Sequence, residues 1–369
     1  MPVTSITMNN ASLQSTLPTP PPLSSLLYSR FNVSKPCNFI TFLGMAQKLQ
    51  IRFLPNTWQE TRPPIGEGAT SQIHQSLLDP RTGFAFKRVG DRDKRERPEK
   101  DIFQHLINEI VILSQAQIRN HPSILELQGI CWDIPDPAES LDSTKDKVWP
   151  VLVFEKSRYG DLFSFAHSED AQELDIHGRL ALCGQIGRAV ARMHSNRIIH
   201  GDLKPQNILI FKDEHDFWLA RVADFGFSKW HTSELDPLEL PHSWPWYAPE
   251  YDEYPSFTPQ QAMRMDVFSF GMLSLWLIFN KSLLGFIPLK NKPKESRSSD
   301  GNDLLEVLAE WKQRRLLTEF AHRLVMQEAD LDAAMQKKLQ RLFNGSLVHE
   351  PHLRDVNMVH LMDAIDMAE

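Results

Sequence analysis

Short apolar segments separated by turn residues dominate the first third of the chain. Apolar and polar positions alternate over Leu49–Leu54, which predicts a strand, and two further strands are predicted over Gln72–Gln75 and Phe84–Val89. Turn residues separate them, with glycines in Ile65–Gly68 and an Asp-Pro-Arg-Thr-Gly sequence at Asp79–Gly83. The pattern therefore predicts three strands joined by two turns.

An amphipathic helix is predicted next, over Asp101–Gln115, after a charged connector at residues 90–101. Its apolar face is formed by residues three or four positions apart: Ile102, Leu106, Ile110 and Leu113. Two strands follow, at about residues 124–132 and 149–155, and a polar loop over Pro135–Lys147 separates them. The first part of the chain is expected to form a sheet with one main helix.

Helical patterns dominate from Leu162 onward. The exceptions are two short apolar segments, Ile208–Phe211 and Leu219–Ala223, which predict a β-hairpin. The longest mainly apolar run, Val267–Phe279, is too short to span a bilayer and predicts a buried core helix. Residues 290–301 (KNKPKESRSSDG) are polar throughout and predict an exposed insertion.

Strands give way to helices near Phe154–Gly160, which predicts an α+β chain with two lobes, residues 48–155 and 156–369. The residues before Lys48 differ, because residues 1–36 are rich in Ser, Thr, Pro and Asn and the first acidic residue is Glu60. A segment of this kind buries little apolar surface.

The composition of residues 1–47 therefore predicts a disordered N-terminal tail. The tail lacks the basic and apolar regions of a secretory signal. A mitochondrial transit peptide stays as an alternative, although the prolines oppose an amphipathic helix and Arg30 is the only arginine in the first 36 residues.

Composition and charge narrow the function classes. The 369-residue chain has 40 basic and 47 acidic residues and a net charge of −7, so it lacks the basic surface that general nucleic-acid binding requires. Its three cysteines are too few and too scattered for a disulfide framework or a Cys-rich zinc site, and they indicate a reducing compartment. We therefore expect a cytoplasmic location, with the nucleus as an alternative, no nucleic-acid partner and no membrane span.

The most specific chemical signal is the run His200–Asn207, with the sequence HGDLKPQN. Four further segments accompany it in the order of the protein kinase signature set: Gly66–Ile73, Phe84–Lys87, Asp224–Gly226 and Ala248–Glu250. The chain therefore resembles the eukaryotic protein kinase superfamily, Ser/Thr type, over about residues 57–365. This resemblance implies the bilobal protein kinase fold.

The resemblance also implies transfer of the γ-phosphoryl group of ATP to Ser or Thr hydroxyls of a protein substrate, with Mg²⁺ as cofactor. Asp202 is expected to accept the hydroxyl proton and orient the nucleophile, and Lys204 to contact the γ-phosphate. Asn207 and Asp224 are expected to hold Mg²⁺, because hard oxygen ligands suit this ion. The catalytic set is thus Asp202, Lys204 and Asn207, whereas the individual substrate and the oligomeric state are left undetermined.

Lys87 is expected to contact the α- and β-phosphates and to need an anionic partner. Glu109, close to the apolar face of the predicted helix, is the preferred partner, and Glu96 and Glu99 in the charged connector are alternatives. The other cofactor-binding residues that the resemblance implies belong to the glycine turn, the adenine pocket and the ribose position: Ile65, Gly66, Gly68, Ile73, Ala85, Glu155, Ser157, Asp161 and Leu209. Asp161 has an equal alternative as a charge at the start of a helix.

Several matched residues are expected to be structural. The resemblance implies that His200 packs in the core, that Glu250 pairs with Arg354, and that Asp266 anchors the catalytic loop. The stretch His349–His352 lacks the spacing that places two histidines on one face of a helix, so it predicts a loop rather than a metal site.

Gly201 stands where the family usually carries an arginine that binds a phosphate on the activation loop. A phosphate there would lack its main cationic partner. We therefore hypothesise that activity does not require phosphorylation of the hydroxyl residues in this segment: Ser228, Thr232 and Ser233.

Three other positions depart from the family pattern. Ser71 replaces the third glycine of the glycine turn, and Ser243 stands where Thr is common, within expected reach of the catalytic loop. Trp244–Tyr247 is unusual beside the substrate-docking region and is expected to pack the large lobe, with a role in substrate choice as the alternative. These departures keep open a second function, that of a kinase-fold pseudoenzyme acting as a nucleotide-binding scaffold, and a kinase of small molecules is a third, less favoured reading.

Overall fold

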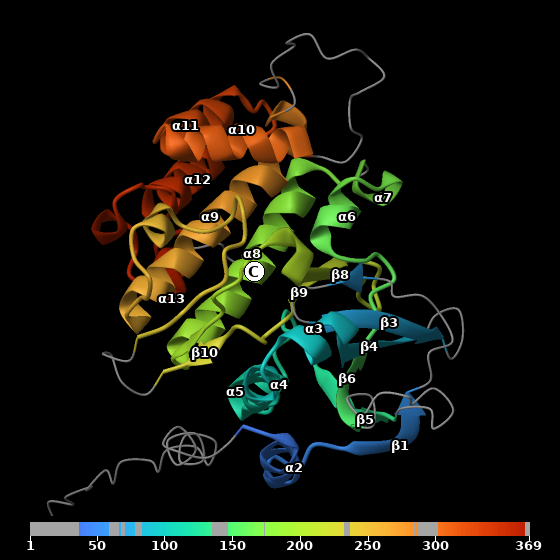
Figure 1. Cartoon of the computed structure of the whole chain (residues 1–369). Coiled ribbons are helices and arrows are strands. Elements are labelled where there is room, and N and C mark those ends of the chain that lie inside the picture. The colour runs from blue at the N-terminus through green and yellow to red at the C-terminus, as the bar shows by residue number, and fades with distance from the viewer. Residues whose placement is uncertain are drawn as a thin grey trace, which may run out of the picture. The chain divides into compact units, whose positions relative to one another are not determined.

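The computed structural model describes residues 37–58, 66–67, 71–77, 83–134, 147–172, 174–231, 237–283, 285 and 302–365. Contacts divide the chain into a unit of Met1–Lys35, which lies outside the described residues, and a unit of Pro36–Glu369, which carries every described element. In the second unit the strands of a large sheet precede a series of helices (Figure 1), so the predicted two-lobed α+β architecture is confirmed.

A six-stranded sheet forms the first lobe, in the order β1-β5-β6-β4-β3-β2. Its strands are β1 (Phe53–Trp58), β2 (Gly66–Glu67), β3 (Ser71–Leu77), β4 (Gly83–Val89), β5 (Leu127–Asp133) and β6 (Trp149–Glu155). Neighbouring strands are antiparallel except β1 and β5, which are parallel. The strands predicted around Gln72–Gln75, Phe84–Val89, 124–132 and 149–155 are therefore present, with small shifts at their ends.

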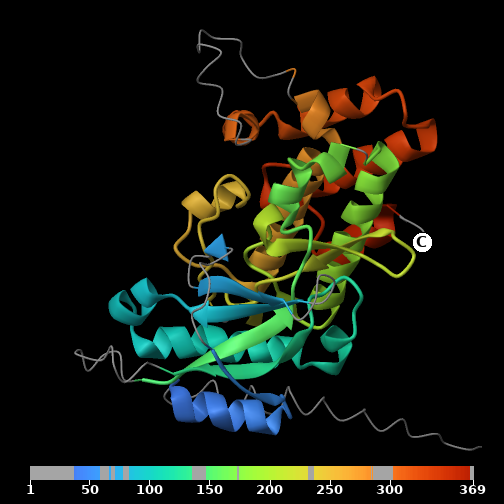
Figure 2. The same cartoon turned by 90° about the vertical axis from the view of Figure 1, so that its right-hand side faces the viewer.

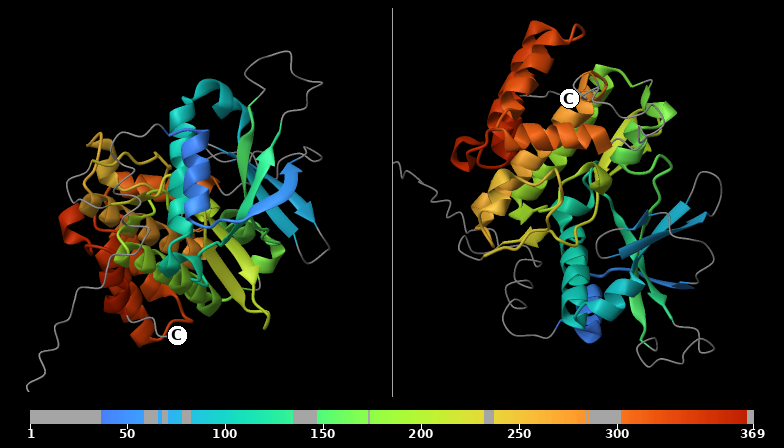
Figure 3. Two further views of the ribbon diagram at one scale, coloured as in Figure 1. Left: turned by 90° about the horizontal axis from the view of Figure 1, so that it is seen from below. Right: turned by 45° about the horizontal axis from the view of Figure 1, so that its top comes forward.

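Helix α4 (Glu99–Leu113) is the main helix of the first lobe, and the apolar face predicted for it is buried. Three shorter helices accompany it: α2 (Phe39–Lys48), α3 (Asp91–Glu96) and α5 (Ala116–Arg119). Figure 3 shows α2 lying alongside α4, and the two helices are in contact. Phe103 of α4 packs toward the sheet by stacking on Trp149 of β6, with ring centroids 5.4 Å apart.

The expected start of the ordered chain near Lys48 is wrong, because helix α2 precedes it. Asn38 caps this helix by accepting a hydrogen bond from the backbone nitrogen of Thr41. Three of its side chains are buried: Phe42, Met45 and Ala46. The strand predicted at Leu49–Leu54 is also displaced, since β1 begins at Phe53 after a turn.

The charged connector predicted at residues 90–101 is likewise corrected. It contains α3, and α4 begins at Glu99 rather than at Asp101. The pair Arg92–Glu96, with nitrogen and oxygen 2.7 Å apart, is spaced one helical turn apart and supports α3. Most of the polar loop Pro135–Lys147, the turn at Asp79–Gly83 and the insertion at residues 290–301 lie outside the described residues.

Eight helices are described in the second lobe, and they lie on the side of the sheet away from α2 (Figure 2). They are α6 (Leu162–Ala166), α7 (Glu169–Gln172), α8 (Ile176–Ser195), α9 (Pro259–Leu283), α10 (Asn302–Gln313), α11 (Leu317–Gln327), α12 (Ala333–Ser346) and α13 (Met358–Ile365). Among the described helices α9 alone has the length and apolar composition to cross a membrane, but 94% of its apolar window is buried inside the fold. The predicted core helix at Val267–Phe279 is therefore confirmed.

Short strands and 3₁₀ turns flank the loops of the second lobe that carry the matched motifs. The predicted hairpin is present as β8 (Ile208–Lys212) and β9 (Trp218–Val222), and a second pair that the sequence did not predict joins β7 (Ile198–Ile199) to β10 (Lys229–Trp230). The 3₁₀ turns are η1 (Pro205–Asn207), η2 (Pro249–Asp252) and η5 (Pro351–Leu353). The segment at His349–His352 thus forms an irregular turn, as predicted.

Candidate active site

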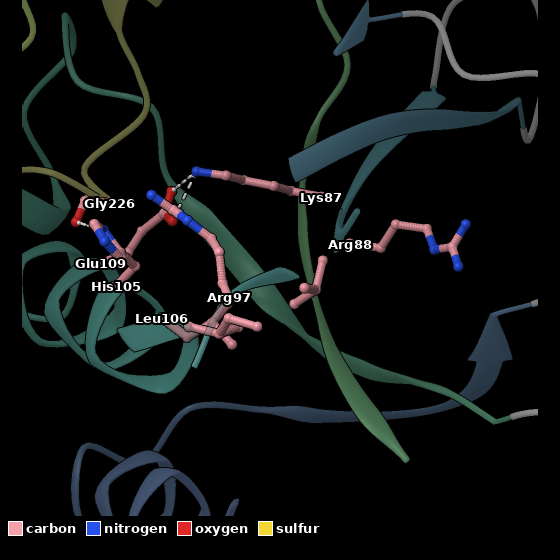
Figure 4. Close-up of a pocket in the computed structure, with 9 residues that line it drawn as sticks. Lys87, Arg88, Arg97, His105, Leu106, Glu109 and Gly226 are labelled. Atoms are coloured by element: carbon pink, nitrogen blue, oxygen red, sulfur yellow. Dashed lines mark hydrogen bonds and ion pairs between the residues drawn. The ribbon is translucent and has the colours of Figure 1, made fainter. Parts of the chain in front are cut away.

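Lys87 lies on β4 and contacts two carboxylates that come from different elements. Figure 4 shows the first of these contacts, between Lys87 and Glu109. The Nζ of Lys87 lies 2.8 Å from Glu109 Oε2 on α4 and 2.9 Å from Asp224 Oδ1, which follows β9. The alternative partners Glu96 and Glu99 pair with other basic residues. The structure therefore brings together three residues that lie 22 and 137 positions apart in the sequence.

The charges in this cluster are fixed by their mutual contacts. Burial lowers the pKa of the Lys87 ammonium, but the carboxylates of Asp224 and Glu109 outweigh burial and hold that pKa above its ordinary value. Burial raises the pKa of Asp224, and Lys87 outweighs burial in turn and lowers the pKa to about 2. At neutral pH Lys87 is therefore a cation and Asp224 an anion. Fixed charges of this kind can bind a phosphate and a hard cation without reorganising.

The carboxylate of Asp202 is held by three side chains. Lys204 Nζ donates to its Oδ2 at 2.8 Å, and Asn207 Nδ2 donates to the same oxygen at 3.1 Å. Ser243 Oγ donates to Asp202 Oδ1 and accepts a hydrogen bond from Lys204 Nζ at 3.0 Å, as the sequence predicted. Asp202 is thus fixed in one orientation, which a proton acceptor in a reaction requires.

Asp266 of α9 anchors the backbone of the loop His200–Asn207, the predicted catalytic loop. Its carboxylate accepts hydrogen bonds from the backbone nitrogens of His200 at 2.8 Å and Gly201 at 2.9 Å, and it contacts His194 Nε2 at 2.9 Å. The buried ring of His200 lies 5.7 Å from the ring of Phe225. The structural roles predicted for Asp266 and His200 are therefore confirmed.

Arg354 and Glu250 form the predicted ion pair. The two guanidinium nitrogens Nη1 and Nη2 donate to Oε1 and Oε2 at 2.7 and 2.9 Å, and both side chains are buried. This parallel arrangement of two hydrogen bonds is a strong form of an Arg–carboxylate contact. It ties η2 to the segment that follows η5.

The strand residues predicted to surround adenine come from two sheets: the adjacent strands β3, β4 and β6 of the large sheet, and β8 of the hairpin. Ala85 of β4 lies opposite Phe154 of β6, and Ile73 of β3 lies opposite Gly66 of β2. Glu155 ends β6, and Leu209 lies on β8. The two remaining members of the glycine turn, Ile65 and Gly68, lie outside the described residues.

Asp161 and Ser157 lie between β6 and α6. Asp161 caps α6, because its Oδ1 accepts a hydrogen bond from the backbone nitrogen of Ser164 at 2.8 Å. The helix-start alternative for Asp161 is therefore present, and its ribose contact stays a prediction. Ser157 Oγ donates to the backbone oxygen of Gly160 at 3.0 Å, which shapes the turn into Asp161.

Asn207 and Asp224 carry the oxygen atoms predicted to hold Mg²⁺. Asn207 Nδ2 donates to Asp202, so its Oδ1 is the side-chain atom available as a ligand. The backbone nitrogen of Ala223 donates to the backbone oxygen of Asn207 at 2.8 Å and connects the two segments that carry the predicted ligands. One carboxylate and one amide oxygen fit Mg²⁺, which takes its other ligands from phosphates and water. Within the described ranges no group of three or more His, Cys, Asp or Glu side chains could hold a metal ion.

Two residues near the site were not predicted from the sequence. His105 lies on α4 one turn before Glu109, and Figure 4 shows it directed toward Gly226, whose backbone oxygen is 2.7 Å from its Nδ1. The spacing of four residues from Glu109 was an available signal, because residues at that spacing share a helix face. The second is Lys312 of α10, which donates to two backbone oxygens near Ser243.

Gly201 adopts a backbone conformation that explains the absence of the usual arginine. Its φ is +78°, a left-handed value, and a Cβ built there would lie 3.0 Å from Leu240 Cδ2. The hydroxyl of Ser228 is buried and donates to the His200 oxygen at 2.9 Å. Phosphorylation of Ser228 would require its hydroxyl to leave this buried position, whereas Thr232 and Ser233 lie outside the described residues.

Gly201→Ala is expected to lower the free energy of unfolding by about 1–2 kcal/mol, because an L side chain in the left-handed region costs about that much. Gly44→Ala is the matched control, since nothing lies within 4 Å of a Cβ on that α2 residue. Alanine is the better helix former there and should raise stability by about 0.5–1 kcal/mol. Urea denaturation of both variants measures the contrast, and equal shifts would contradict the strain at Gly201.

Comparison with known proteins identifies the family. The family model described as the protein kinase domain matches residues 59–356. The chain belongs to the protein kinase family. The matched region of this kinase begins after α2 and β1 and ends before α13, so it contains both charged clusters described above.

Similar curated kinases come from a plant and a mammal. Wall-associated receptor kinase-like 1 of Arabidopsis thaliana is 28% identical over 79% of this chain and 36% of its own length. Putative wall-associated receptor kinase-like 16 of the same organism is 30% identical over 60% of this chain and 46% of its own length. Serine/threonine-protein kinase TNNI3K of Mus musculus is 29% identical over 64% of this chain and 25% of its own length. The chain thus spans less than half of each of these relatives.

Proposed function

We propose that this kinase transfers the γ-phosphoryl group of Mg²⁺-bound ATP to Ser or Thr hydroxyls of protein substrates. The observation that carries the proposal is the contact of Lys87 with both Glu109 and Asp224, because phosphoryl transfer needs this lysine–glutamate pair and this aspartate in place together. The names of relatives such as serine/threonine-protein kinase TNNI3K support Ser and Thr as acceptors.

Asp202 is the proposed proton acceptor. The substrate hydroxyl oxygen forms a bond to the γ-phosphorus as the bond from that phosphorus to the β–γ bridging oxygen breaks, and ADP leaves. The hydroxyl proton goes to the Asp202 carboxylate, which Lys204, Asn207 and Ser243 hold in place. The ammonium of Lys204 also stabilises negative charge on the transferred group.

The nucleotide is held by residues of both lobes. Lys87 contacts the α- and β-phosphates, and its pair with Glu109 fixes the direction of the ammonium. Asn207 and Asp224 would hold Mg²⁺, which would neutralise negative charge on the phosphates. Ile73, Ala85 and Leu209 supply apolar contacts to adenine, and the backbone of Glu155 and Ser157 supplies hydrogen bonds.

A phosphorylation assay tests this function. Purified protein is incubated with labelled ATP, Mg²⁺ and a generic protein substrate, and the labelled residues are identified after acid hydrolysis. We expect phosphoserine or phosphothreonine that disappears when EDTA removes Mg²⁺ and in the Asp202→Asn variant prepared in parallel. Equal incorporation by the wild type and Asp202→Asn contradicts the proposal. Binding of ATP without any incorporation favours the alternative, a nucleotide-binding scaffold.

A further inference from the structure

Lys312 is a buried lysine of α10 that lies outside the kinase signature motifs. Its exposed fraction is 7%, although lysine is rarely buried so fully unless it is paired. Its ammonium donates hydrogen bonds to the backbone oxygens of Pro245 at 2.7 Å and Tyr247 at 2.9 Å. It also lies over the ring of Tyr247, 3.5 Å from the centroid. Three contacts therefore connect one ammonium to a single short loop.

The groups that contact the Lys312 ammonium are two backbone oxygens and an aromatic ring rather than a carboxylate. Burial lowers the pKa of Lys312 to about 8, and the more distant carboxylates of Asp252 and Glu250 only partly oppose this. Glu250 is already bound by Arg354 through both oxygens. The partners that offset the desolvation of the ammonium are thus the two carbonyl groups and the aromatic ring of the loop.

Lys312 contacts the loop Ser243–Tyr247, which we call the docking segment. The first residue of this segment contacts the proposed catalytic residues. The backbone nitrogens of Trp246 and Tyr247 donate to the Ser243 oxygen at 2.8 and 3.1 Å, which closes the segment into a tight turn. At its start, Ser243 Oγ contacts both Asp202 and Lys204. The position of the docking segment is therefore coupled to the position of the proposed proton acceptor.

The side chains of the docking segment divide between core and surface. Trp246 is 1% exposed and packs edge-on against Trp276 of α9, with ring centroids 5.8 Å apart. Trp244 is 47% exposed, next to Ser243. The packing role predicted for this stretch thus holds for Trp246, whereas Trp244 presents an apolar surface next to Ser243, which contacts Asp202 and Lys204.

We propose that Lys312 is a positioning residue for the protein substrate, which holds the docking segment in the shape that places Trp244 and Ser243 beside the acceptor hydroxyl. This inference rests on the proposed protein kinase function and names the part of the fold that seats its substrate. Lys312 contacts the docking segment and none of the residues proposed to hold the nucleotide, so its removal is expected to affect binding of the protein substrate more than binding of ATP.

The test compares Lys312→Met with Lys281→Met. Lys281 is an exposed lysine of α9 that also donates to a backbone oxygen, that of Gln172 at 3.3 Å, but it does not contact the docking segment. We expect Lys312→Met to raise the KM for the protein substrate about 10-fold and to leave the KM for ATP within about twofold, because two buried carbonyls lose their donor. Lys281→Met is expected to change neither constant.

Hydrogen exchange of the unliganded protein gives a second readout that does not depend on activity. The amides of Trp246 and Tyr247 should exchange about 10-fold faster in Lys312→Met and at the wild-type rate in Lys281→Met. If Lys312→Met does not fold, Lys312→Gln takes its place in both measurements. Changes in the same direction but of smaller size are then expected, because the glutamine amide is a shorter and uncharged donor.

Unchanged exchange of the docking segment overturns the inference. A rise in both KM values together, or faster exchange without a change in the KM for the protein, overturns it as well, since either result assigns Lys312 a purely structural role. A wild-type protein that transfers no phosphate contradicts the proposed function instead, and the exchange contrast still decides whether Lys312 holds the docking segment.

Discussion

Asp202→Asn is expected to lower kcat for protein phosphorylation by about 100- to 10,000-fold, the range that a positioned proton acceptor contributes. Asparagine has nearly the same shape, but its side-chain amide cannot accept the proton of the substrate hydroxyl. It also cannot form the ion pair that joins Asp202 to Lys204, whose nitrogen and oxygen lie 2.8 Å apart. The KM for ATP should change little, because Lys87, Glu109 and Asp224 are untouched. Steady-state kinetics at saturating ATP measures both constants.

Asp175→Asn is the matched control for this substitution. Asp175 caps α8 by accepting a hydrogen bond from the backbone nitrogen of Gly178 at 2.7 Å, and asparagine is an equally good cap. The control should therefore keep the activity and stability of the wild type. A loss of activity in both variants, or in neither, would show that the Asp202 carboxylate has no special part in the reaction.

The charged clusters of the site could be predicted because their members lie in motifs with fixed spacing. Asp202, Lys204 and Asn207 fall within six residues of one another, so one loop brings them together. Lys87 and Asp224 lie far apart in sequence, and the resemblance to a known family placed them in one site. The choice of Glu109 over its alternatives followed from the apolar face of its helix, since α4 must turn that face toward the sheet.

The role of Lys312 could not be predicted, because its partners are backbone oxygens. Every residue carries such an oxygen, so no side-chain pattern marks the two that Lys312 selects, 67 and 65 positions earlier in the chain. In the sequence Lys312 looks like an ordinary charge on an amphipathic helix. Only the packing of α10 against the docking segment shows that this charge is buried.

Helix α2 was missed for a different reason. The Ser-, Thr-, Pro- and Asn-rich composition that predicts a disordered tail belongs to residues 1–36, whereas the short apolar helix begins after Asn38. The local signals were present, because Asn38 is a favourable cap and Phe39, Phe42 and Ala46 are spaced three and four residues apart. The composition of the tail predicts little burial of apolar surface, but α2 buries its apolar side chains against α4.

The buried side of α2 leads to the last prediction. Phe42 is fully buried, and its ring lies 6.2 Å from that of Phe103 on α4. Phe42→Ala is expected to lower the free energy of unfolding by about 3–5 kcal/mol, the usual cost of removing a buried aromatic ring. Ile40 is the matched control on the same helix, since its side chain is 72% exposed. Ile40→Ala should change stability by no more than about 0.5 kcal/mol.

Denaturation of the two variants, followed by the circular dichroism of the whole chain, measures this contrast. The effect should extend to catalysis, because α4 carries Phe103 on the side that meets α2 and Glu109 on the side that meets Lys87. We expect the KM for ATP to rise in Phe42→Ala under conditions in which the protein is still folded, and to stay unchanged in Ile40→Ala. Equal stability of the two variants would contradict the docking of α2 on α4. If Phe42→Ala is destabilised but its KM for ATP is unchanged, α2 stabilises the fold without affecting the Lys87–Glu109 pair.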